Sequence, residues 1–359
     1  MDLGITPVRR APLPGCLPFK VVHYDGKLIR NNNPRQQPAT IIRNNITQQP
    51  EAILRVLLIG GTALIGPHVI RELMSNDVFD LHTVTRQGKK YYCETAHRAD
   101  RRDLSALSSA INRIRPDVII DMIPFTAVDA SNLVSAITGS DTKLIAVSSI
   151  DVYSAYACLH QTENTPVQTC PLTETMPVRK ELGPEGIAYD KLSVEAIYND
   201  NLNDVCILRL PAIYGWPDCT RVSAYLDKML DGADEITLDK HLGNWKFSRC
   251  LHKNAAYSIA LTVLSNQTGR HTYNVADEIV YTERQWIEKI GKACGWHGTI
   301  VESDNSDKTI NWLQDFYVST EKIRSELAYF DKYSTGEGLT DTVAFHAYQR
   351  TGITYKKYY

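Results

Sequence analysis

A glycine-rich turn between a buried strand and a helix is the first place where this sequence could do chemistry. Residues 55–59 (RVLLI) form an apolar run, and the segment GGTALIG follows between Gly60 and Gly66. Such a turn points backbone N–H groups and the positive end of a helix dipole above the strand, where an anionic pyrophosphate would bind. The spacing therefore predicts dinucleotide binding, although a buried strand and helix can also use glycine without any ligand. Ala63 takes the middle glycine position, and its methyl group would obstruct an approaching phosphate.

The end of the second predicted strand (residues 81–86, LHTVTR) bears on which dinucleotide is bound. In dinucleotide folds an acidic residue here binds the ribose hydroxyls, whereas an arginine accommodates a 2′-phosphate. Arg86 ends this strand, Lys89 and Lys90 follow, and no carboxylate is within reach. We therefore expect NADP(H) rather than NAD(H), with a solvated loop arginine as the alternative.

Alternating strand and helix patterns must position these residues. Strands are predicted at residues 55–59, 81–86, 91–100, 117–123, 143–149 and 205–210, and helices at 64–73, 104–114, 127–137 and 188–200. Strands separated by helical patterns of about 10–15 residues indicate βαβ units. The predicted fold class is α/β, a doubly wound parallel Rossmann sheet with its ligand crevice at the carboxyl ends of the strands. We expect this domain over 53–213 and a smaller C-terminal substrate-binding region over 214–359.

The C-terminal region has shorter and more mixed patterns. A helix is expected at residues 222–230 and a hairpin through 235–247. Asn254 is expected to cap the helix that follows it, and Thr282 with Gln285 forms a capping-box pair ahead of another helix.

Residues 1–52 form a separate zone that is rich in Pro, Asn, Gln and Arg. This composition is typical of a partly irregular arm, with a small hairpin over 19–30 around Asp25 and Gly26. The arm could lie across the domain or reach a partner subunit, which leaves a homodimer open.

Composition excludes several classes of function. The 359 residues are 43% hydrophobic and 22% charged, with a net charge of -2, which gives no electrostatic footprint for nucleic acid or an anionic membrane. The eight cysteines stand singly, without ligand spacing, as in a reduced cytoplasmic protein without a metal site. No apolar run approaches the roughly 20 residues that span a bilayer. The partner expected is a small-molecule substrate.

From about Leu54 to Arg350 the chain resembles the extended short-chain dehydrogenase/reductases, specifically the NAD-dependent epimerase/dehydratase family. The motifs run in the family's order: GGTALIG, ADRRD, VIIDMI, VSSIDVY, KLSVE, LRLPAIYG, FSRCLHKNAA and YNVAD. The resemblance implies a Rossmann domain and a small substrate region. It implies cofactor contacts from Gly60, Thr62, Ala63, Leu64, Ile65, Gly66, Arg86, Asp100, Arg101, Lys191 and Pro211.

The resemblance also implies a catalytic Ser, Tyr and Lys. The Ser maps to Ser149 and the Lys to Lys191, while Ile187 stands four residues before that lysine, where the family has its Tyr. Tyr189 is only two residues before, about 200° round a regular helix. Either the helix begins late and Tyr189 reaches the site from an irregular turn, with Lys191 lowering its pKa, or the acid/base is lost.

Three further residues are predicted to face the substrate: Asp151, Tyr153 and Arg249. Related sugar-nucleotide dehydratases carry two adjacent acids before their Val-Tyr pair, and here Ile150 replaces the first, which disfavours water elimination. Arg249 stands where relatives often hold a substrate phosphate, with a structural arginine as the alternative. The leading function is an NADP(H)-binding oxidoreductase or epimerase-like enzyme acting on a small carbonyl or secondary alcohol compound, such as a nucleotide sugar or natural-product intermediate. The alternative is a catalytically silent dinucleotide-binding or regulatory protein.

Overall fold

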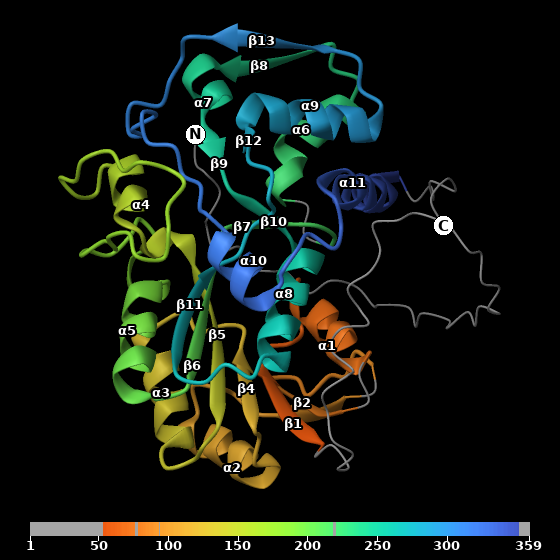
Figure 1. Cartoon of the computed structure of the whole chain (residues 1–359). Coiled ribbons are helices and arrows are strands. Elements are labelled where there is room, and N and C mark those ends of the chain that lie inside the picture. Colours follow the sequence, from red (N-terminus) through yellow and green to blue (C-terminus); the bar gives the residue numbers. More distant parts are fainter. Residues whose placement is uncertain (1–52, 76–77, 93, 218–219, 352–359) are drawn as a thin grey trace. The chain divides into compact units, whose positions relative to one another are not determined.

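The computed structural model describes residues 53–75, 78–92, 94–217 and 220–351 (Figure 1). The predicted arm over 1–52, with its hairpin at 19–30, lies outside the described residues.

A parallel sheet of seven strands is the centre of the described chain. Its strands are β1 (Leu54–Ile59), β2 (Phe79–Thr85), β3 (Thr95–Arg98), β4 (Val118–Asp121), β5 (Lys143–Ser149), β6 (Val205–Leu210) and β11 (Arg270–Asn274). Their order is β11-β6-β5-β4-β1-β2-β3, and every neighbouring pair is parallel. The order reverses direction between β1 and β4, which is where doubly wound folds bind their ligands. The predicted fold class is confirmed.

Helices cover both faces of this sheet (Figure 1). On one face lie α1 (Gly66–Met74), α8 (His252–Leu264) and α10 (Glu321–Leu327); on the other lie α2 (Leu104–Ile114), α3 (Ala127–Ile137) and α5 (Lys191–Asn201). Because successive strand side chains point to opposite faces, Val56 packs into the first layer and Leu57 into the second. Burial on both faces explains why the central strands β1, β4, β5 and β6 are mostly apolar runs.

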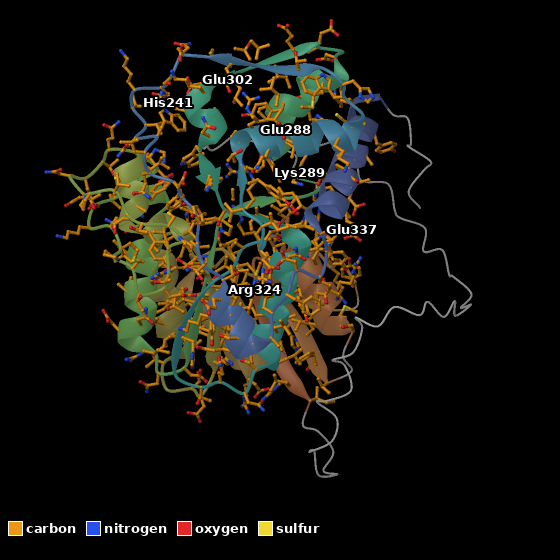
Figure 2. The ribbon with its side chains drawn as sticks, turned by 45° about the horizontal axis from the view of Figure 1, so that its top comes forward. His241, Glu288, Lys289, Glu302, Arg324 and Glu337 are labelled. Carbon is orange, nitrogen blue, oxygen red and sulfur yellow. The ribbon has the colours of Figure 1, made fainter. Side chains whose placement is uncertain are left out.

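Shorter elements make up the rest of the fold. They are α4 (Ser154–Leu159), β7 (Ala212–Tyr214), α6 (Thr220–Leu230), β8 (Glu235–Asp239), α7 (Lys240–Asn244), β9 (Lys246–Phe247), β10 (Arg249–Leu251), β12 (Tyr281–Thr282), α9 (Glu283–Cys294), β13 (Thr299–Ser303) and α11 (Thr335–Thr351). The strands pair as β7 with β10, β8 with β13 and β9 with β12. Charged side chains such as Glu288 and Glu302 cover the outside of this region (Figure 2). The division at residue 213 stays a prediction, and three elements beyond it, β11, α8 and α10, belong to the central layers.

Two local predictions for this region are wrong. Residues 235–247 do not form a hairpin, because Asp239 accepts hydrogen bonds from the N–H groups of His241 and Leu242 and so caps α7. Asn254 does not cap α8, which already begins at His252. Its buried side chain instead donates to Asp277 and to the carbonyl of Tyr333. The capping box of Thr282 and Gln285 is confirmed.

Candidate functional site

The turn between β1 and α1 needs glycine at both of its ends. Gly60 has φ +87°, and a Cβ there would lie 2.6 Å from Cγ1 of Ile123. A Cβ on Gly66 would lie 2.5 Å from the backbone of Gly61, so the first turn of α1 can approach the loop only without a side chain. Ala63 is exposed at the outside of the turn. The glycine spacing therefore reflects the close return of the chain over the carboxyl end of β1.

The beginning of α1 fits an anionic group. Its N-cap residue, Ile65, makes no side-chain hydrogen bond to the helix, and the first turn holds no acidic residue. Within the helix, Pro67 has no N–H, and the N–H groups of Gly66 and His68 donate to the carbonyls of Ala63 and Ile65. A pyrophosphate would therefore meet the positive end of the helix dipole and the backbone of the turn over 61–65, which fits a dinucleotide.

Lys191 is held at the carboxyl ends of two neighbouring strands. Its Nζ donates to the carbonyl oxygens of Pro124, after β4, and Val147, in β5, at 2.9 Å each. The side chain is buried, and burial lowers the pKa of its ammonium to about 8. An ammonium has three donors, so one remains for a further partner.

Tyr189 reaches this lysine because α5 begins late. The 3-10 turn η3 (Gly186–Ala188) precedes it, and Asp190 caps α5 by accepting the N–H of Ser193 at 3.2 Å. The N–H of Asp190 also donates to the carbonyl of Phe125 at 2.7 Å, which ties this segment to the end of β4. The Tyr189 ring centroid lies 5.5 Å from Nζ of Lys191. Of the two alternatives, the structure shows the late helix start.

Ser149 joins Tyr189 to Asp151. Its Oγ accepts the N–H of Asp151 at 3.2 Å, which begins the turn η2 (Ile150–Val152) at the end of β5. Burial raises the pKa of Asp151 to about 6, and hydrogen bonding with Ser149 opposes the shift. Burial and then the charge of Asp151 raise the pKa of Tyr189, again against hydrogen bonding with Ser149. The pKa of Tyr189 is therefore raised and not lowered as expected, because burial and the nearby acids outweigh the Ser149 hydrogen bond and the charge of Arg221.

Sequence reasoning missed three charged residues near this cluster. Glu185, before η3, accepts a hydrogen bond from the hydroxyl of Tyr156 and raises the pKa of Asp151. Arg179 is buried and donates to the carbonyl of Asp151 at 2.9 Å. Arg221, exposed at the start of α6, acts on both Asp151 and Tyr189 by its charge. All three lie in irregular segments or next to them, where no periodic pattern identifies them.

Three predicted site residues are engaged elsewhere. Arg101 is buried and donates to Asp121 at 2.8 Å. The buried hydroxyl of Tyr153 donates to Oδ1 of Asn274 at 2.7 Å. Arg249 forms an ion pair with Glu283, and its guanidinium lies 4.6 Å from the centroid of Trp286.

The remaining predicted cofactor contacts lie along the carboxyl edge of the sheet. Arg86 is exposed directly after β2, Asp100 is exposed after β3, and Pro211 is buried between β6 and β7. Thr62, Leu64 and Ile65 are half-buried in the turn after β1. The cluster of Ser149, Tyr189 and Lys191 and the turn after β1 thus share one edge of the sheet.

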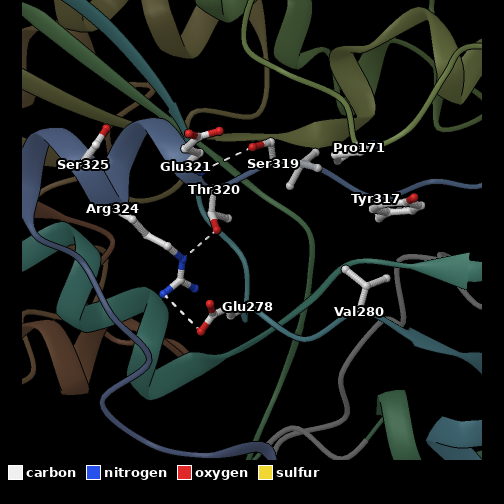
Figure 3. Close-up of a pocket in the computed structure, with 10 residues that line it drawn as sticks. Pro171, Glu278, Val280, Tyr317, Ser319, Thr320, Glu321, Arg324 and Ser325 are labelled. Atoms are coloured by element: carbon white, nitrogen blue, oxygen red, sulfur yellow. Dashed lines mark hydrogen bonds and ion pairs between the residues drawn. The ribbon is translucent and has the colours of Figure 1, made fainter. Parts of the chain in front are cut away.

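A groove on another part of the surface holds none of the predicted site residues (Figure 3). It is lined by Pro171, Glu278, Val280, Tyr317, Val318, Ser319, Thr320, Glu321, Arg324 and Ser325. Arg324 donates to Oγ1 of Thr320 at 2.8 Å and to Asp331 at 2.6 Å. Its charge therefore stabilises the fold here.

Within the described ranges no helix combines the length and apolar character that crossing a membrane requires. Nor do three or more His, Cys, Asp or Glu side chains in the same ranges gather where they could hold a metal ion.

Comparison with known proteins gave three kinds of match. Residues 56–276 match the model of a family described as the NAD dependent epimerase/dehydratase family. The chain is 26% identical over 271 residues to a 2′-dehydrokanamycin reductase of Streptomyces kanamyceticus, covering 70% of each chain. Among solved structures it is similar to a UDP-glucose 4-epimerase of Thermotoga maritima with UDP-glucose, at 17% identity and a TM-score of 0.63 over 83% of this chain and 100% of the other. It is also similar to a UDP-glucose-4-epimerase of Stenotrophomonas maltophila with bound NAD and formylated UDP-arabinopyranose, at 16% identity and a TM-score of 0.66 over 84% and 100%.

Proposed function

Because the chain belongs to the NAD-dependent epimerase/dehydratase family, we propose that it is an NADP(H)-linked oxidoreductase that interconverts a carbonyl and a secondary alcohol on a sugar-like small molecule. The observation that carries the proposal is the convergence of Ser149, Tyr189 and Lys191 at the carboxyl ends of β4 and β5. Similarity to a reductase of 2′-dehydrokanamycin and to sugar-nucleotide epimerases supports the substrate class.

In this proposal each residue has one task. When bound, a nicotinamide would supply or accept the hydride at the substrate carbon. Tyr189 exchanges the proton at the substrate oxygen, and Ser149 holds that oxygen by a hydrogen bond. Lys191, fixed by two carbonyls, orients the bound cofactor and stabilises the tyrosine oxygen after the proton has left.

The protonation state of Tyr189 suits the step that donates a proton to a carbonyl oxygen. A raised pKa keeps the Tyr189 phenol protonated at neutral pH, which is the form that donates a proton to a carbonyl oxygen. Asp151 is the second candidate donor, because burial raises its pKa to about 6. Elimination of water is disfavoured, since Ile150 replaces the first of the two acids of related dehydratases.

Preference for NADP(H) rests on the end of β2. Arg86 is exposed there, and exposed Lys89 and Lys90 follow it. Three positive charges at this point suit a 2′-phosphate better than a free hydroxyl. NAD(H) is the alternative cofactor.

The test is the reduction of a panel of sugar-like ketones by NADPH. The reaction is monitored by the loss of absorbance of the reduced nicotinamide. Tyr189→Phe should lower kcat by at least about 100-fold, the contribution of a positioned proton donor, and leave the Kd for NADPH unchanged. Tyr317→Phe is the matched control, because Tyr317 lies in the groove of Figure 3. If Tyr189→Phe keeps full activity and Asp151→Asn loses it, Asp151 and not Tyr189 is the proton donor.

One observation favours a second function, a dinucleotide-binding protein without chemistry. Ile187 stands at the family's tyrosine position, lies in η3 and is 80% exposed, and its side chain has no hydroxyl to exchange a proton. Tight NADPH binding without hydride transfer to any ketone in the panel would support this second function.

A further inference from the structure

The loop that follows β2 begins with a tight turn that lies on the end of β3. The N–H of Gly88 donates to Oγ1 of Thr85 at 2.9 Å and to its carbonyl oxygen at 3.3 Å. Gly88 has φ +63°, and a Cβ on it would lie 3.2 Å from Cβ of Arg98. Arg98 is the last residue of β3 and pairs with Thr85 in the parallel register of β2 and β3. The turn that contains Arg86 therefore lies against Arg98.

The side chain of Arg98 points to the face of the sheet that α1 covers. Its neighbour His97 points to the opposite face, because Nδ1 of His97 lies 3.0 Å from Nη2 of Arg113 in α2. Successive side chains of a strand alternate between the two faces, so Arg98 faces away from α2. Arg98 therefore lies at the carboxyl edge of the sheet, on the side of the glycine turn that leads into α1.

Two positively charged residues thus flank the turn after β2. Arg86 and Arg98 are both exposed, and within the described ranges the side chain of neither forms a hydrogen bond or an ion pair. Asp100, the acidic residue nearest to Arg98 in the sequence, accepts the N–H of Arg102 at 3.0 Å. A phosphate accepts several charge-assisted hydrogen bonds at once, and the guanidinium fork matches its oxygens. Two arginines beside one turn therefore suit a phosphate better than a neutral hydroxyl.

We propose that Arg98 is a specificity-determining residue that binds the 2′-phosphate of NADP(H) together with Arg86. This inference rests on the proposed NADP(H) linkage and adds a residue from β3 to the basic residues that follow β2. Arg86 lies in the turn itself, whereas Arg98 extends from the neighbouring strand, so donors from two strands hold the phosphate. The free 2′-hydroxyl of NADH offers no charge to either residue, so discrimination between the two cofactors depends on both arginines.

The experiment measures dissociation constants of the full chain for NADPH and NADH by fluorescence titration. Calorimetry with 2′,5′-ADP and 5′-AMP, which differ only in the 2′-phosphate, separates this contact from those of the nicotinamide. Arg98→Ala should weaken NADPH and 2′,5′-ADP on the order of 10-fold, the worth of one charge-assisted hydrogen bond, and leave NADH and 5′-AMP unchanged. Arg98→Lys keeps the charge without the fork, so it should weaken the two 2′-phosphorylated ligands by less.

Arg115→Ala is the matched control. Arg115 is also exposed but follows α2, at the amino edge of the sheet ahead of β4, so this variant loses the same charge far from the turn. It should bind all four ligands like the wild type. An unchanged preference for NADPH in Arg98→Ala, or an equal loss of affinity for both cofactors, would overturn the role of Arg98 and leave the proposed function in place. A wild type that binds NADPH no more tightly than NADH would show that the proposed NADP(H) linkage fails, and this inference with it. Circular dichroism and the thermal midpoint of each variant separate a binding defect from misfolding.

Discussion

Two buried histidines predict how the stability of this protein depends on pH. His252, at the start of α8, is 1% exposed and His68, in α1, is 7% exposed, and their ring centroids lie 4.3 Å apart. Nδ1 of His252 lies 3.1 Å from the carbonyl oxygen of Tyr214, which can only accept, so Nδ1 carries the hydrogen. Nε2 of His252 is buried without a hydrogen-bond partner. A proton added there would therefore be an uncompensated buried charge.

The magnitude follows from the pKa values. Burial, followed by the charge of Lys253, lowers the pKa of His252 from 6.5 to about 4. Burial, His252, Arg71 and Lys253 lower the pKa of His68 to about 3. In the unfolded chain these groups titrate near 6.5, so between pH 6.5 and about 4 the unfolded state binds a proton that the native state does not. The free energy of unfolding then falls as pH falls, and His252 alone accounts for about 2 kcal/mol at pH 5.

The assay is unfolding by urea, monitored by circular dichroism, at several pH values from 7.5 to 5. The substitution His252→Asn keeps a donor for the Tyr214 carbonyl and removes the titrating ring. Its free energy of unfolding should fall less over this range than that of the wild type, by about 2 kcal/mol. His241→Asn is the control, because His241 is exposed on α7 (Figure 2), and it should follow the wild type. Parallel pH profiles for the wild type and His252→Asn would refute the reasoning, since the wild-type histidine would then already be charged in the native state or solvated.

Four other outcomes are expected. Arg86→Ala should weaken NADPH by about 1–3 kcal/mol through loss of a charge-assisted hydrogen bond, and equal calorimetric affinities of the wild type for NADPH and NADH would exclude this role. Ala63→Gly should tighten cofactor binding, because glycine has no Cβ to obstruct the phosphate; unchanged affinity would show that the turn already accommodates the methyl. Glu195→Ala should lower the free energy of unfolding by about 3–5 kcal/mol, because it leaves buried Arg209 without the carboxylate that it binds at 2.7 Å, whereas exposed Glu235→Ala should have little effect in the same urea titration. Asp103→Ala should lower the free energy of unfolding by about 1 kcal/mol, because it removes the side chain that accepts the Ala106 N–H at the start of α2. A thermal midpoint equal to that of the wild type would contradict this.

The central strands were predictable because the sheet is buried on both faces. Such strands are continuous apolar runs, and the helices between them carry strong signals such as the Asp103 cap. The strand β11 (RHTYN) was not predicted, since it lies at the edge of the sheet and only its last residues are fully buried. An edge strand can be polar, so its composition does not distinguish it from a loop.

The candidate site was predictable only where the signal is local. The glycine turn follows from spacing and Lys191 from the resemblance of KLSVE to the family motif. The late start of α5 could also be predicted, because Asp190 is a favourable N-cap residue. Arg101 and Arg249 could not be excluded from the sequence, since their partners, Asp121 and Glu283, lie far away in the chain.

The position of β11 has a consequence for biosynthesis. It lies beside β6 (Figure 1), yet the ribosome makes it only after β7 to β10 and α6 to α8. Until then a nascent chain that has already paired its first six strands presents the backbone N–H and C=O groups of β6 as an open edge. Such an edge can pair with another chain, so a protein truncated between the end of β6 and the start of β11 should aggregate.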